Sequence, residues 1–181
     1  MMNVLAHKDY SDSQVEEPAL FLNETETSIT KLLQQPLDQL MAQAAEKDIT
    51  LFYEPTKINI NLKIDQQKIR QAVTHVVNNA IRFSYASSSV YVSTGCDFNG
   101  DAYIRIDDEG PGIDSDMLER TFEPFTKVKN GIKTSSENTG RGLSMINAYL
   151  KMHFGYIRIQ STPSRGTSVT LTLPKSCIIR R

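Results

Sequence analysis

Three stretches of this 181-residue chain carry side chains whose types and spacing could do chemistry. The first is a predicted helix that begins after Asp65, a suitable N-cap, and runs to about residue 83. At about 100° per residue, one face of this helix carries His75, Asn79, Arg82 and Phe83. An Asn amide oxygen suits Mg²⁺, and an arginine one turn away can bind a phosphate. An ordinary solvated helix face would have the same composition, so both interpretations stay open at this point.

The second stretch, Asp108-Glu109-Gly110-Pro111-Gly112, follows a predicted strand over residues 102–107. A carboxylate at the end of a strand can accept a hydrogen bond from the exocyclic amine of a purine. The flanking glycines carry no side chains that would keep a flat base from the backbone. Asp, Gly and Pro also build tight turns for purely local reasons, and the residues alone do not separate the two readings.

The third stretch, Thr139-Gly140-Arg141-Gly142, precedes a predicted helix over residues 143–152. Glycines at the start of a helix let unpaired backbone N–H groups reach an anion, and the helix dipole favours negative charge there. The stretch is neither a dinucleotide-binding fingerprint, since it follows a polar loop, nor a Walker motif, since no Gly-Lys-Ser/Thr follows. It is weak evidence alone, because glycine also serves loops in general.

In this order and spacing, the three stretches resemble the boxes of the catalytic, ATP-binding domain of bacterial sensor histidine kinases. This domain belongs to the superfamily shared with DNA gyrase, heat-shock chaperone and mismatch-repair ATPases. The similar segments are the Asn box (His75–Ser84), the first glycine box (Asp108–Ile113), the phenylalanine box (Phe122–Phe125), the second glycine box (Thr139–Met145) and the last strand (Gly166–Pro174). The resemblance covers residues 20–174, and the phenylalanine box distinguishes the kinases from their ATPase cousins.

The resemblance implies a domain that binds Mg-ATP and donates the γ-phosphate to a histidine on a partner domain of a two-component sensor kinase. It implies catalytic roles for Asn79, the Mg²⁺ ligand, for Arg82, which stands where the family usually has a phosphate-contacting Lys, and for His75. The implied nucleotide contacts are Phe83, Asp108, Gly110, Gly112, Ile113, Phe125, Lys127, Thr139, Gly140, Arg141, Gly142, Leu143 and Thr167. Asp108 would hold the adenine amine, with Thr167 supporting it through a hydroxyl or a water. Residues 126–138 would form a mobile ATP lid, in which Lys127, Lys129 and Lys133 are candidate phosphate sensors.

Besides Arg82, three positions depart from the family pattern. His75 stands where the kinases commonly have Asn and the ATPases have a Glu that activates water, which weakens the case for hydrolysis. Asn138 replaces the first glycine of the second glycine box, and Arg141 replaces a Leu. A non-catalytic nucleotide-binding or docking module is therefore the alternative function, and a gyrase-type hydrolytic ATPase is a third reading that the missing Glu disfavours.

The elements around these stretches predict a two-layer α/β (α+β) sandwich, with a mixed, largely antiparallel sheet of about five strands covered on one face by three helices. Residues 27–47 show helical periodicity, and the remaining strands are expected at 49–53, 58–64, 90–96, 156–160 and 167–173. We expect residues 1–26 to be the frayed tail of a preceding dimerisation hairpin, 27–174 the catalytic domain and 175–181 a C-terminal tail.

Composition limits the partners and the location of the chain. The net charge of −1 provides no general positive field for nucleic acid or for direct membrane contact. Two distant cysteines and the lack of a long apolar run favour a cytoplasmic domain, whose parent receptor could still be membrane-anchored. Neither His7 nor His153 suits the phosphoacceptor role, so the expected partners are a separate phosphoacceptor and dimerisation domain and a downstream response regulator.

Overall fold

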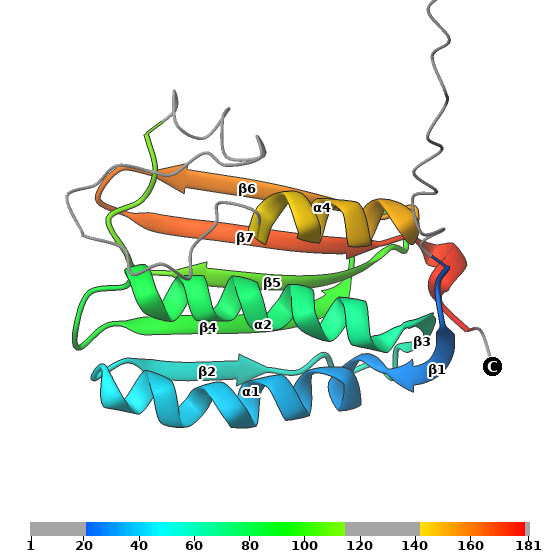
Figure 1. Cartoon of the computed structure of the whole chain (residues 1–181), viewed down its shortest axis with the longest axis horizontal. Coiled ribbons are helices and arrows are strands. Elements are labelled where there is room, and N and C mark those ends of the chain that lie inside the picture. Colours follow the sequence, from blue (N-terminus) through cyan, green and yellow to red (C-terminus); the bar gives the residue numbers. More distant parts are fainter. Residues whose placement is uncertain (1–20, 115–141, 180–181) are drawn as a thin grey trace, which may run out of the picture.

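The computed structural model describes residues 21–114 and 142–179. Three helices lie side by side on one face of a twisted sheet (Figure 1). Along the chain the elements are β1 (Glu24–Ser28), α1 (Ile29–Glu46), β2 (Thr50–Glu54), β3 (Asn61–Asp65), α2 (Gln66–Phe83), β4 (Ser89–Cys96), β5 (Ala102–Asp108), α4 (Gly142–Met152), β6 (Tyr156–Thr162), β7 (Gly166–Leu173) and the 3₁₀ helix η2 (Lys175–Cys177).

The main sheet has the strand order β2-β4-β5-β7-β6. Strand β2 pairs with β4 in parallel, whereas the other neighbouring pairs are antiparallel. A separate two-stranded sheet joins β1 to β3. The predicted two-layer sandwich, with a mixed and largely antiparallel sheet of five strands under three helices, is confirmed.

The core lies between the helices and the face of the sheet that they cover. Helices α1 and α2 each bury seven residues along one stripe, and the strands alternate, so that Val90 and Val92 of β4 and Ile104 and Ile106 of β5 lie in the core. The opposite face of the sheet carries side chains that are more exposed, including the stacked rings of Phe52 and Tyr91, whose centroids lie 5.1 Å apart.

The predicted start and end of α2 are confirmed. Asp65 is the N-cap, because its Oδ1 accepts a hydrogen bond from the backbone N–H of Lys68 at 3.1 Å. The predicted β4–β5 hairpin is also present: Gly100 adopts a φ of +82°, and the Asp97 carboxylate accepts hydrogen bonds from two backbone N–H groups of the turn.

Two expectations about the N-terminal part of the chain are wrong. Residues 24–26, predicted to be frayed, begin β1 and pair antiparallel with β3. The strand predicted from residue 58 begins only at Asn61, and Ile58 is 57% exposed. In both places the available pairing partner decides the structure, because a strand forms only where another strand can satisfy its backbone. None of the helices in the described ranges is long and apolar enough to cross a membrane.

Candidate functional site

The structure describes most of the residues implied to bind a nucleotide. Phe125, Lys127, Thr139, Gly140 and Arg141 lie outside the described residues, as do the other two lid lysines and the predicted short helix near residues 115–120. The remaining site residues come from the end of β5 and the segment that follows it, the C-terminal half of α2, the start of α4 and the start of β7.

The Asp108 carboxylate is held in place by the backbone of two neighbouring segments. Its Oδ1 accepts hydrogen bonds from the N–H groups of Gly110 at 2.9 Å and Thr167 at 3.1 Å. No described residue donates to Oδ2, which leaves that oxygen available to an external donor. Burial raises the pKa of Asp108, and the two backbone hydrogen bonds oppose that shift.

Thr167 contacts Asp108 through its backbone N–H, and its hydroxyl lies 2.9 Å from the Ser161 hydroxyl instead. Ser161 Oγ also accepts from the N–H of Ile113 at 2.8 Å and donates to the carbonyl of Gly166 at 2.9 Å. Because Ser161 has one hydroxyl proton, Thr167 donates to Ser161 when Ser161 donates to Gly166. Ser161 therefore fixes the segment that follows Asp108, a role that the sequence did not indicate.

The end of α2 packs directly against the segment after Asp108. A Cβ at Gly110 would lie 2.7 Å from the backbone carbonyl oxygen of Phe83, so only glycine allows this approach. Gly112 has a φ of +70°, and a Cβ there would lie 2.2 Å from the carbonyl oxygen of Thr162. Both positions thus require glycine because neighbouring backbone lies too close for a side chain. This requirement holds whether or not the glycines also leave space for a base.

The start of α4 packs against α2 one helical turn before Asn79. A Cβ at Gly142 would lie 1.9 Å from Nε2 of His75, which shows how closely the imidazole approaches the first residue of α4. The His75 side chain is half-buried, and burial lowers its pKa, so the ring is held in its neutral form. The next residue, Leu143, packs against the core.

Asn79 and Arg82 are half-buried on the same helix. The Arg82 guanidinium carbon lies 5.6 Å from the centroid of the Phe83 ring, which is a cation–π distance, and Phe83 is 46% exposed. No hydrogen bond joins the Asn79 amide to another described residue. That free amide oxygen fits a Mg²⁺ ion that takes one ligand from the protein and further ligands from phosphates and water. Within residues 21–114 and 142–179, no three His, Cys, Asp or Glu side chains form a metal cluster.

The described parts of the three stretches are therefore brought together, because α2 contacts Gly110 at its end and Gly142, the one described residue of the third stretch, at His75. Two surface depressions, of about 460 and 530 Å³, lie elsewhere: one between residues 54–58 and 93–96, the other between β1, α1 and the start of α2. The predicted lid, residues 126–138, lies outside the described part of the chain.

Comparison with known proteins gives consistent results. The sequence profile for histidine kinase-, DNA gyrase B-, and HSP90-like ATPases matches residues 64–176. The adaptive-response sensory kinase SasA of Synechocystis sp. is 30% identical over 147 residues, which are 81% of this chain and 38% of that protein. The circadian input-output histidine kinase CikA of the same organism is 29% identical over 166 residues, covering 90% and 22%. The chain thus spans well under half the length of these relatives.

Solved structures share the fold. Full-length ShkA in complex with AMPPNP superposes with a TM-score of 0.76 at 22% identity, over 86% of this chain and 32% of ShkA. The nucleotide-free catalytic domain of the histidine kinase ThkA gives a TM-score of 0.72 at 20% identity, over 84% and 95%. The chain therefore belongs to the family of histidine kinase-, DNA gyrase B- and HSP90-like ATPases, as a domain of the sensor histidine kinase type.

Proposed function

We propose that this domain binds Mg-ATP and donates the γ-phosphate to a histidine on a separate phosphoacceptor domain of the same sensor kinase. A response regulator would then receive the phosphate downstream. The observation that carries the proposal is the Asp108 carboxylate. Two backbone N–H groups fix its Oδ1, and its Oδ2 is without a donor among the described residues. An oxygen oriented in this way can accept the adenine amine without first reorganising.

The chemistry asked of the chain is mainly positioning, because phosphoryl transfer needs little covalent help from the protein. Asn79 would hold the Mg²⁺, which neutralises charge on the phosphates, and Arg82 would add a second positive charge one turn further along α2. His75 is held neutral by burial and lies against Gly142, so it would shape the phosphate side of the site. A carboxylate that could activate water is absent at position 75, which supports transfer over hydrolysis.

Calorimetric titration with Mg-AMPPNP tests the pocket. In Asp108→Asn, Oδ1 keeps its two backbone donors, and an NH₂ group takes the place of Oδ2. That group would meet the adenine amine as a second donor. We expect affinity to fall by about tenfold or more, which corresponds to one lost charged hydrogen bond.

Asp107→Asn is the matched control for this titration. The change in charge is the same, but Asp107 lies on the opposite face of β5, where it pairs with Arg105 at 3.0 Å. We expect nearly unchanged affinity for this variant. Equal affinity in the parent and both variants would contradict the proposed role of Asp108.

Phosphotransfer distinguishes a kinase domain from a non-catalytic nucleotide-binding or docking module. Incubated alone with radiolabelled ATP, the chain should acquire no stoichiometric acid-labile phosphate. The buried His153 has hydrogen bonds at both ring nitrogens and cannot act as the acceptor. A phosphoacceptor domain added in trans should become labelled. Nucleotide binding without such labelling would support the non-catalytic alternative, and steady phosphate release by the domain alone would favour a hydrolytic ATPase.

A further inference from the structure

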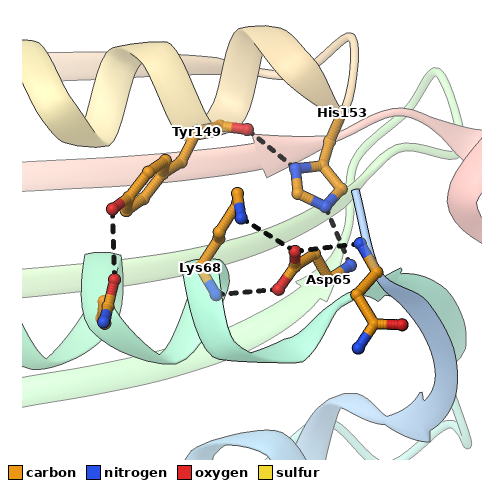
Figure 2. A network of polar contacts seen from close by, with 6 residues as sticks. Asp65, Lys68, Tyr149 and His153 are labelled. Carbon is orange, nitrogen blue, oxygen red and sulfur yellow. Dashed lines mark hydrogen bonds and ion pairs between the residues drawn. The ribbon is translucent and has the colours of Figure 1, made fainter. Parts of the chain in front are cut away.

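His153 lies just beyond α4, at the end of that helix far from the candidate nucleotide site, and only 1% of it is exposed. Its Nε2 accepts a hydrogen bond from the backbone N–H of Asp65 at 3.0 Å, and its Nδ1 lies 2.7 Å from the carbonyl oxygen of Tyr149 (Figure 2). A backbone N–H can only donate and a carbonyl can only accept. The neutral ring therefore carries its proton on Nδ1, and one side chain joins the end of α4 to the N-cap of α2.

Further contacts gather around this ring. The Tyr149 hydroxyl donates to Oε1 of Gln71 at 3.2 Å, and the Lys68 ammonium lies 5.8 Å from the centroid of the Tyr149 ring. Lys68 also forms an ion pair with Asp65 at 3.0 Å. Figure 2 shows these side chains bridging the two helices. Polar contacts thus join the C-terminal half of α4 to the first turns of α2.

The apolar attachment of α4 is slight by comparison. Of its 11 residues only Ile146 and Leu150 are fully buried, whereas α2 buries seven of its 18. An α-helix of this length is stiff and about 16 Å long, so that fixing one end constrains the other. The other end of α4 is Gly142, which lies against His75.

We propose that His153 is a positioning residue that sets where the start of α4 lies relative to His75 and Asn79, and thereby the phosphate side of the nucleotide site. The inference rests on the proposed function, because it requires that phosphates bind at the start of α4. The adenosine side, built by Asp108 and the end of α2, does not depend on this contact.

Two substitutions separate the hydrogen bond from His153 to Asp65, which joins α4 to α2, from the hydrogen bond to Tyr149 at the end of α4 itself. In His153→Asn, the shorter amide can still donate to Tyr149 but does not reach Asp65. His153→Gln is long enough to accept from the Asp65 N–H. We expect His153→Asn to weaken Mg-AMPPNP binding by about tenfold and adenosine binding by less than about twofold, and His153→Gln to restore most of the affinity. Calorimetry measures the analogue, and NMR titration measures adenosine.

Leu37→Ala is the control for general loss of stability. Leu37 is 2% exposed on α1, and its truncation destabilises the fold without touching the contact between α4 and α2. It should leave both affinities unchanged at a temperature where the protein is folded. Unchanged analogue affinity in folded His153→Asn, or an equal loss for adenosine, would overturn the inference. If the unmodified chain binds no Mg-AMPPNP, the proposed function fails, and this inference fails with it.

Discussion

At the scale of single residues, Asp108 is a candidate nucleotide contact, and burial of its carboxylate lowers the stability of the fold when the carboxylate is charged. Burial raises its pKa in the folded chain above the ordinary value of an aspartate. The folded state then binds the proton more tightly than the unfolded state, so stability falls as the pH rises through the folded pKa. A residue retained despite this cost is typical of a functional site.

We therefore expect Asp108→Asn to be more stable than the parent at neutral pH, although it binds nucleotide less well. The Asn carbonyl oxygen can still accept from Gly110 and Thr167, and no charge is buried. The difference should be small at about pH 4 and larger at about pH 7, as measured by urea unfolding. A variant that is less stable than the parent at both pH values would contradict this account.

The contact between Gly142 and His75 gives a second prediction at this scale. In Gly142→Ala, the added methyl group would overlap the imidazole ring of His75. We expect this overpacking to lower the free energy of unfolding by about 1–3 kcal/mol. In a His75→Ala background, the same change should be neutral or slightly stabilising, because Ala favours a helix over Gly. Urea unfolding of the four proteins measures the coupling. An equal cost in both backgrounds would show that the clash is relieved without strain.

Among the site residues, the sequence indicated Asp108 and the glycines through the order and spacing of the three stretches, because the same residues taken alone also build ordinary turns. It could not indicate Ser161, since a serine in an alternating strand has no distinctive pattern. It indicated that Thr167 supports Asp108 through a hydroxyl or a water, whereas the contact in the structure is made by the backbone N–H of Thr167, which strand register places next to Asp108. The proposed nucleotide contacts themselves remain predictions.

At the scale of elements, α2 was predicted to within one residue at both ends, because its N-cap and its apolar stripe are both local signals. Strand β1 was missed, since its sequence Glu-Thr-Glu-Thr-Ser is polar and its pairing with β3 is encoded some 40 residues away. Local patterns thus gave the described helices and the main sheet well, and the two-stranded sheet of β1 and β3 poorly.

The N-cap of α2 gives a prediction at the element scale. The Asp65 carboxylate is 4% exposed and accepts hydrogen bonds from the backbone N–H groups of Lys68 and Asn23 and from the Lys68 ammonium. Burial alone would raise its pKa, but these donors lower it, so its stabilising effect is present at neutral pH and is lost as the pH falls through the folded pKa.

Asp65→Ala should cost about 1–2 kcal/mol at neutral pH, measured by urea unfolding. Asp65→Asn is the control, because Asn is also a good N-cap. It should cost less than Asp65→Ala, since the oxygen that accepts from the Lys68 backbone N–H is kept. The NH₂ group that replaces Oδ2 no longer accepts from the Asn23 N–H or the Lys68 ammonium, so part of the cost remains. If both variants cost the same, the ion pair with Lys68, rather than the cap, would account for the effect.

At the scale of the whole molecule, the sheet depends on pairs that are distant in sequence. Strand β5 pairs on one side with β4, its neighbour in a hairpin, and on the other with β7, which begins 58 residues after Asp108 at Gly166. The overall α/β sandwich was predictable from the alternation of elements. The strand order was not predictable, because it depends on which strands pair although they are distant in the sequence.

A chain that ends at residue 114 should therefore lose more than the elements it lacks. It would expose the edge of β5, where seven residues normally pair with β7, and the adjoining apolar face. We expect this truncated chain to aggregate at micromolar concentration while the full chain stays in solution, as measured by light scattering. A monomeric, folded truncated chain would contradict this prediction.

The same strand pairing sets an order of events during protein synthesis. When β5 leaves the ribosome, its hairpin partner β4 has already emerged, but β7 has still to be translated. At about 5–20 residues per second the delay lasts several seconds, which is long compared with hairpin formation. The nascent polypeptide must therefore keep one unpaired β edge soluble until β7 has been made, and a translational pause within residues 115–165 would prolong its need for chaperones.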